Sequence, residues 1–157
     1  MPSFSALKGS QNKSEPKNRR MLPHTSKIQY RVIYADIDKM GVVYYGNYAR
    51  LFEMGRTVMI REMGLPYIEL EKDGVMMPVY SVESKFRNVL KYDELITIET
   101  TVKELPTARM EFFHRIYNED GGLAHEARVV LVFMDMKTGR PVRAPEKLVS
   151  LLKNYNG

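Results

Sequence analysis

The sequence contains no cysteine and no tryptophan. The absence of cysteine excludes disulfide bonds, thiolate metal sites and a cysteine nucleophile. Long hydrophobic runs are absent too, since none approaches the ~20 residues that a transmembrane helix requires. Residues 1–20 carry charges where a signal peptide would have an apolar segment. We therefore expect a cytoplasmic protein without a membrane span.

Positive charge is concentrated at the start of the chain. The 157 residues carry a net charge of +5, and residues 1–26 hold five lysines and arginines against one glutamate, a net charge of +4. This segment is rich in serine, lysine, asparagine and proline, which predicts a disordered tail before a single domain over residues 27–157. A translation start at Met21 is an alternative explanation of the segment. Because the rest of the chain is almost neutral, we do not expect nucleic-acid binding.

Hydrophobic spacing predicts one long helix and several strands. Alternation with a period of two predicts a strand from Lys27 to Tyr34. Apolar residues then recur every three or four positions from Tyr48 to Met63, which predicts a helix of about sixteen residues. Further strands are expected over residues 77–89, 95–105, 109–118 and 123–136, a helical turn over 67–72 and a helix over 145–154.

This order of elements favours an α+β fold. About five antiparallel strands would wrap around one long central helix, with a hairpin turn at Glu119–Gly122. A sheet of this kind leaves an edge strand with unpaired backbone groups. We therefore expect two chains to pair through their sheet edges.

The segment from Tyr34 to Tyr48, YADIDKMGVVYYGNY, joins the first strand to the long helix. It holds two aspartates, Asp36 and Asp38, before a predicted turn at Gly41 and a predicted helix N-cap at Asn47. A carboxylate near a helix N-terminus lies beside N–H groups that can stabilise an oxyanion, which is typical of hydrolases. By spacing alone, Asp38 is either such a carboxylate or a turn residue that accepts backbone N–H bonds.

Other polar residues have plainer interpretations. We expect a structural hydrogen-bonding role for Asp36, because no histidine or further acid lies nearby to complete a metal site. The spacing of Glu53 and Arg56 predicts an ion pair on the helix. His114 and His125, on two neighbouring predicted strands, are interpreted as surface or interface residues. No metal and no cofactor are expected.

From Lys27 to Leu152 the sequence resembles the hot-dog-fold 4-hydroxybenzoyl-CoA thioesterase family, in particular its YbgC-like acyl-CoA thioesterases. The resemblance rests on the segment above, on Tyr48–Arg56 (YARLFEMGR), on Gly64-Leu65 and on Lys91–Leu95 (KYDEL). It implies a five-stranded sheet curled around the helix, and a homodimer or homotetramer with active sites shared between two chains. The implied reaction converts acyl-CoA and water into a free acid and coenzyme A.

The resemblance also implies roles for single residues. Asp38 matches the catalytic carboxylate, which would act as nucleophile or as general base. The backbone N–H of Tyr45 would polarise the thioester carbonyl. The neighbouring residues expected at the substrate site are Gly41, Val42, Tyr44 and Asn47.

Three basic residues near the end of a predicted strand are candidates for binding the phosphates of coenzyme A. They are Lys85, Arg87 and Lys91. The alternative is that they form an ordinary solvated strand end.

The sequence departs from the family pattern at three positions. Ile37 replaces a threonine, Tyr45 replaces a histidine, and Gly55 replaces an alanine of the helix. The change at Tyr45 is compatible with a role of the backbone N–H but not of an imidazole. Two alternative functions remain: a thioesterase acting on an acyl carrier protein, and a non-catalytic acyl-binding protein of the same fold. Acyl chain length and type are not predicted.

Overall fold

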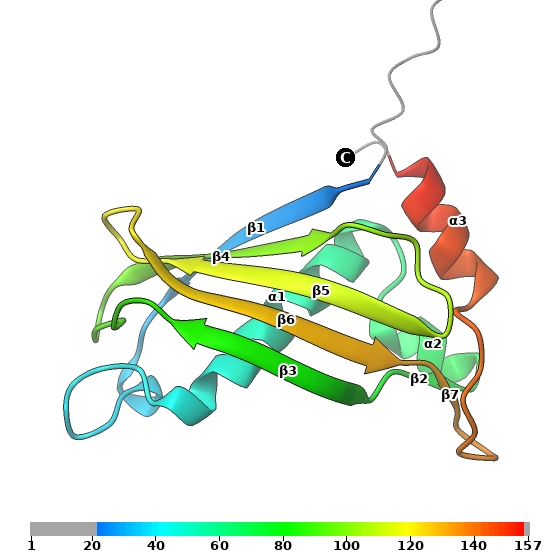
Figure 1. The fold of residues 1–157 in the computed structure, drawn as a ribbon, viewed down its shortest axis with the longest axis horizontal. Coiled ribbons are helices and arrows are strands. Elements are labelled where there is room, and N and C mark those ends of the chain that lie inside the picture. The colour runs from blue at the N-terminus through cyan, green and yellow to red at the C-terminus, as the bar shows by residue number, and fades with distance from the viewer. Residues whose placement is uncertain (1–21, 156–157) are drawn as a thin grey trace, which may run out of the picture.

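The structure is a computed structural model that describes residues 22–155. It contains a five-stranded antiparallel sheet with the order β1-β4-β5-β6-β3, and helix α1 (Tyr48–Glu62) lies across one face of that sheet (Figure 1). The strands are β1 (His24–Arg31), β3 (Val79–Phe86), β4 (Leu95–Val102), β5 (Arg109–Tyr117) and β6 (Leu123–Val132). The predicted α+β architecture is confirmed. Residues 1–21, most of the predicted tail, lie outside the described residues.

Alternation along the central strands buries one face of the sheet. In β4 and β5 every second residue is buried. These inward residues are Ile96, Ile98, Thr100 and Val102 in β4, and Met110, Phe112, His114 and Ile116 in β5. They form the core together with the buried side of α1.

Helix α1 has the apolar periodicity that the sequence predicts, and ends within one residue of the predicted position. A 3₁₀ turn, η2 (Tyr45–Asn47), leads into it, and Gly64 with a φ of +92° follows its end. Gly55 brings α1 close to β4, since a Cβ atom at this position would lie 2.3 Å from Oγ1 of Thr100. The glycine that departs from the family pattern therefore has a packing reason.

Smaller elements gather at one end of β3. They are α2 (Tyr67–Lys72), β2 (Val75–Met76) and β7 (Met134–Asp135), which lie near the start of β3 (Figure 1). The loop that precedes α1 lies at the opposite end, where β3 finishes. Helix α3 (Glu146–Asn154) buries Leu148 and Leu152. Both short helices match their predicted ranges to within one residue.

The first strand is displaced from its predicted range. It begins at His24 instead of residue 27, so the last residues of the predicted tail belong to the sheet. Thr25 and Ser26 pair with the end of β4, and Oγ1 of Thr25 lies 2.9 Å from Oγ1 of Thr101. The strand ends at Arg31, before the 3₁₀ turn η1 (Tyr34–Asp36). Residues 24–26 are polar, so their composition did not indicate a strand. Polar residues are common in edge strands such as β1.

Within residues 22–155, no helix is both long and apolar enough to cross a membrane.

Candidate active site

A tight turn over residues 38–42 forms the tip of the segment that joins η1 to α1. Gly41 has a φ of +77°, a conformation that favours glycine. The N–H of Asp38 donates to the carbonyl of Val42 at 3.0 Å, and the N–H of Gly41 donates to the carbonyl of Asp38 at 3.0 Å. Oδ1 of Asp38 accepts the N–H of Met40 at 2.8 Å. One carboxylate oxygen of Asp38 therefore stabilises the turn.

Backbone hydrogen bonds fix this turn against the rest of the molecule. The N–H of Val43 donates to the carbonyl of Leu90 at 2.8 Å, and Val42 pairs with Lys91 in an isolated bridge. The N–H of Tyr44 donates to the carbonyl of Asp36 at 2.9 Å. Leu90 and Lys91, where the KYDEL segment begins, therefore hold the turn over residues 38–42 in place.

Asp36 lies under the turn and is only 1% exposed. Its Oδ2 accepts the hydroxyl of Tyr30 at 2.7 Å and the N–H of Ile33 at 2.9 Å. Its Oδ1 accepts the guanidinium of Arg50, which reaches it from α1. Both oxygens are occupied, so the predicted structural role of Asp36 is confirmed.

Asn47 immediately precedes α1, as predicted, but it does not cap the helix with its side chain. Its Nδ2 donates instead to the carbonyl of Asp36 at 2.8 Å. The predicted cap bond is wrong because Asn47 already has helical angles (φ −88°, ψ −10°) as the last residue of η2. A side-chain cap requires extended angles at this position.

A pocket of about 290 Å³ opens beside the turn, between η2 and the end of β3. It brings together four of the predicted site residues: Asp38, Val42, Tyr45 and Arg87. Its remaining lining is largely apolar and consists of Met40, Val43, Tyr48, Phe86, Asn88 and Val89. Oδ2 of Asp38 has no hydrogen-bond partner among residues 22–155, so this oxygen remains available to a ligand.

Tyr45 starts η2 with its side chain 69% exposed. Its N–H donates to no backbone carbonyl within the described part of the chain, as is usual for the first residue of a helical turn. Tyr44 is also exposed, and its ring lies 4.7 Å from that of Tyr45. A hydrogen bond with Tyr45 raises the pKa of Tyr44. Tyr48, the first residue of α1, is buried.

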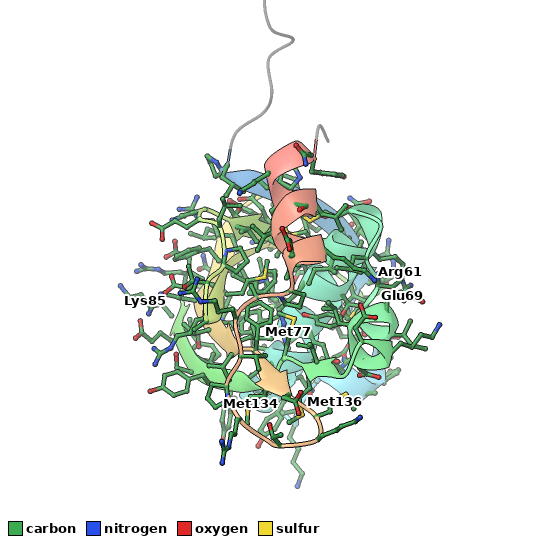
Figure 2. All side chains as sticks on the ribbon, turned by 90° about the vertical axis from the view of Figure 1, so that its right-hand side faces the viewer. Arg61, Glu69, Met77, Lys85, Met134 and Met136 are labelled. Carbon is green, nitrogen blue, oxygen red and sulfur yellow. The ribbon has the colours of Figure 1, made fainter. Side chains whose placement is uncertain are left out.

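The three predicted phosphate-binding residues are dispersed. Arg87 borders the pocket, but its guanidinium donates to Oε2 of Glu126 at 3.0–3.1 Å. The backbone of Lys91 lies against Val42, and its side chain is exposed. Lys85 points away from the pocket, on the outer side of the sheet opposite the side of Arg61 and Glu69 (Figure 2). Within one chain, therefore, the structure does not bring Lys85 to Asp38.

His114 and His125 are buried in the core, so the predicted surface or interface position of these two histidines is wrong. His114 is 1% exposed and His125 is 0% exposed. Both project from the inner face, where His114 stacks on Phe52 at 5.0 Å and His125 stacks on Tyr48 at 4.2 Å. Nδ1 of His114 lies 3.1 Å from Oγ1 of Thr100. Alternation with Phe112 and Ile116 was the sequence signal for burial of His114.

Burial keeps both imidazoles neutral. It lowers the pKa of His114 to about 3, with a further contribution from the charge of Arg56. It lowers the pKa of His125 to about 4, against a weaker opposing effect of Glu126. His125 lies behind Tyr48 and Phe86, two walls of the pocket, with Phe86 at 4.5 Å. These rings therefore support the pocket as packing groups.

A metal site is not indicated in the described part of the chain. Residues 22–155 contain no group of three or more histidine, cysteine, aspartate or glutamate residues arranged to hold a metal ion. Asp36, the closest acid to Asp38 in sequence, is occupied by Tyr30, Ile33 and Arg50. The site offers one available carboxylate oxygen, one available N–H and an apolar wall, which suits hydrolysis of an activated acyl group.

Comparison with known proteins gives a consistent result. A family model described as the thioesterase-like superfamily matches residues 32–152. The chain is 28% identical over 123 residues to the acyl-CoA thioester hydrolase YbgC of Escherichia coli O6:H1, covering 78% of this chain and 92% of that protein. It is 33% identical to a crystal structure of a DHNA-CoA thioesterase from Staphylococcus aureus, with a TM-score of 0.73, covering 76% of this chain and 80% of that one. A 4-hydroxybenzoyl CoA thioesterase complexed with 4-hydroxybenzoyl CoA shares the fold, at 24% identity and a TM-score of 0.74, covering 82% of this chain and 98% of that one.

Proposed function

The chain belongs to the thioesterase-like superfamily, and we propose that it is an acyl-CoA thioesterase that uses Asp38 and the N–H of Tyr45. The sequence resemblance to this family is thereby confirmed. The relatives named above are thioester hydrolases, which supports the reaction class. The single observation that carries the proposal is that Asp38 and Tyr45 line one pocket while Asp36 does not.

The reaction requires a nucleophile at the carbonyl carbon and a donor at the carbonyl oxygen. The N–H of Tyr45, at the start of the helical segment that continues into α1, donates to the oxygen as negative charge develops. In one route Asp38 takes a proton from water, whose oxygen attacks the carbon; the C–S bond then breaks, and the proton passes from Asp38 to the departing sulfur. In the other, Asp38 itself attacks, and water then hydrolyses the resulting mixed anhydride. Both routes release a free acid and the coenzyme A thiol.

Release of free thiol from a panel of acyl-CoA esters tests the proposal. We expect Asp38→Asn to lower kcat/KM by about 10²–10⁴-fold, because the variant can neither take a proton nor attack. Asp73→Asn, at the far end of β3 and paired with Lys147 at the surface, is the control for loss of one negative charge. Equal activity of Asp38→Asn and the unmodified chain contradicts the proposal.

Mass spectrometry of acid-quenched single turnovers separates the two routes. A nucleophilic Asp38 adds the mass of the acyl group to the chain, whereas a general base leaves the mass unchanged. Parallel assays with matched acyl-CoA and acyl-carrier-protein thioesters identify the donor. We place the activity in the cytoplasm, in keeping with a sequence free of cysteine.

We further propose that two chains pair through β3, the strand at one edge of the sheet. Its side chains are almost all exposed, and four of them are large and apolar: Val79, Tyr80, Val82 and Phe86. An exposed apolar edge of this kind favours pairing with a second strand. Sedimentation of the unmodified chain should give a dimer or a dimer of dimers, and Val82→Glu should shift it towards the monomer.

A further inference from the structure

A second pocket lies at the opposite end of β3 from Asp38. It has a volume of about 450 Å³ and is formed by α1, α2 and β2. Its polar lining consists of Glu53, Arg56, Thr57, Tyr67 and Glu71. Met76, Met77 and Pro78 contribute to its apolar walls, and Figure 2 shows Met77 between the sheet and the helices.

Arg56 places a buried positive charge in this pocket. It is 7% exposed, and its Nε has no hydrogen-bond partner. The predicted ion pair with Glu53 is wrong, since Arg56 forms no ion pair within residues 22–155. Its position four residues after Phe52 and three before Met59 turns it to the buried side of α1. Buried guanidinium groups are normally paired, so the Nε–H of Arg56 is a donor that lacks its acceptor.

Tyr67 supplies a second such group. Its hydroxyl is buried and has no hydrogen-bond partner. Burial raises its pKa, and the Arg56 guanidinium, which lies close to the hydroxyl but outside hydrogen-bond geometry, opposes this to a smaller extent, so the hydroxyl keeps its proton. Arg56 and Tyr67 thus bring two unpartnered donors to the lining of one pocket, and a ligand that satisfies them carries an acceptor oxygen. The methionine walls fit a flexible aliphatic chain leading to that oxygen.

Pairing through β3 would bring the two pockets of different chains together. A two-fold axis across the strand reverses its direction in the second chain. The Phe86 end, beside the Asp38 pocket, then approaches the Val79 end of the second chain, beside its Arg56 pocket (Figure 1). One elongated site would therefore combine Asp38 of one chain with Arg56 and Tyr67 of the other.

We infer that Arg56 and Tyr67 bind an oxygen at the far end of the acyl group, a hydroxyl or a carboxylate. The inference rests on the proposed thioesterase function and on β3 pairing. The thioester lies at Asp38 of one chain, and the acyl chain runs along the methionine walls of the other. Glu53 and Glu71, both exposed at the rim, disfavour a carboxylate relative to a hydroxyl.

Three acyl-CoA esters of equal length test the inference: hexanoyl-CoA, 6-hydroxyhexanoyl-CoA and adipyl-CoA. We expect the better of the two oxygen-bearing esters to exceed hexanoyl-CoA in kcat/KM by about 10–100-fold, the effect of a hydrogen bond to a charged group. Arg56→Met should bring this ratio close to one, and Tyr67→Phe should lower it by about 3–10-fold. Arg61→Met removes an exposed charge from the same helix and should leave the ratio unchanged.

Several outcomes overturn the inference. A ratio near one in the unmodified chain means that water alone satisfies Arg56 and Tyr67. If neither Arg56→Met nor Tyr67→Phe changes the kcat/KM ratio, another residue binds the oxygen. Tyr67→Phe removes only an unpartnered hydroxyl and should keep its Tm, so misfolding does not obscure this result. If no ester is hydrolysed, the thioesterase proposal fails, and calorimetric binding of the same esters still measures the selectivity.

A hybrid dimer tests whether the pockets of two chains act together. A chain with Asp38→Asn is combined with a chain carrying Arg56→Met. If each site is shared, one site of the hybrid is intact and the selectivity for the oxygen-bearing ester returns. If each site belongs to a single chain, the hybrid hydrolyses all three esters without selectivity, and the shared site is excluded.

Discussion

The turn before α1 and the core beneath it both contain polar side chains, but these side chains differ in their hydrogen bonding and in their access to a pocket. In the turn, each oxygen of Asp36 accepts a hydrogen bond, while Asp38 lines a pocket and only one of its oxygens accepts a hydrogen bond. In the core, His114 and His125 are buried among aromatic rings with few hydrogen bonds and lowered pKa values. The difference separates residues available for chemistry from residues that act as flat packing groups.

The buried histidines of the core have no part in the proposed mechanism. A histidine with a pKa of about 3 or 4 stays neutral at physiological pH, and neither His114 nor His125 lines the Asp38 pocket. In the proposed mechanism, acid–base catalysis therefore rests on Asp38. The replacement of the family's histidine by Tyr45 is compatible with this proposal, since the backbone N–H remains.

Replacing each aspartate in turn tests the division between Asp36 and Asp38 and should give the largest effect on stability. We expect Asp36→Ala to lower the free energy of unfolding by about 3 kcal/mol, because it leaves the Tyr30 hydroxyl and the Ile33 N–H without their buried acceptor. Asp38→Ala loses only one exposed bond to the Met40 N–H, so we expect about 1 kcal/mol or less. Urea denaturation measures both values.

Activity completes this comparison. At temperatures where Asp36→Ala remains folded it should retain most of its kcat, whereas Asp38→Ala should be inactive and stable. Similar losses of stability in the two variants would mean that both aspartates hold the turn. Loss of kcat in folded Asp36→Ala would give that residue a part in the chemistry.

The fold and the central motif could be predicted from the sequence because both depend on local patterns. The spacing of apolar residues located α1, and the order of Asp36, Asp38 and Gly41 located the turn. Asp36 could be assigned a structural role because no metal partners accompany it. Contacts that depend on tertiary packing could not be predicted in this way. An example is the side chain of Asn47, which donates to the carbonyl of Asp36 and does not cap α1.

Polar residues on buried faces were the main source of error. His114 and Arg56 occupy inward positions by their periodicity, but polarity suggested a surface or interface position for His114 and an ion pair with Glu53 for Arg56. A periodicity argument that ignores residue type would have placed them correctly. The unpartnered groups of Arg56 and Tyr67 have no sequence signature, because they result from the meeting of α1 and α2.

The contact between α1 and the core offers a second test, with an intermediate effect. Gly55→Ala adds a Cβ atom 2.3 Å from Oγ1 of Thr100 and 3.2 Å from Cγ2 of Ile98. Alanine favours a helix by up to about 1 kcal/mol, but overpacking should exceed this and give a net loss of about 2 kcal/mol. Thr100→Ala in the same chain removes the closest atom, so the double variant should lose less than the sum of the two single variants. Additive losses would contradict the predicted clash.

The smallest expected effect concerns the pH dependence of stability. The pKa of His125 is about 4 in the folded chain and near 6.5 when unfolded, so between these values only the unfolded chain binds the proton. Its contribution to stability is therefore present above pH 6.5 and is lost as the pH falls towards 4, by on the order of 1–2 kcal/mol at pH 5. His125→Leu keeps an apolar side chain between Tyr48 and Phe52 but cannot be protonated. Its stability, measured by urea denaturation, should fall less between pH 7 and pH 5 than that of the unmodified chain. An equal fall in stability in the two chains would mean that His125 binds a proton as readily in the folded as in the unfolded chain. Burial in the core would then not set His125 apart from the exposed polar groups of the turn.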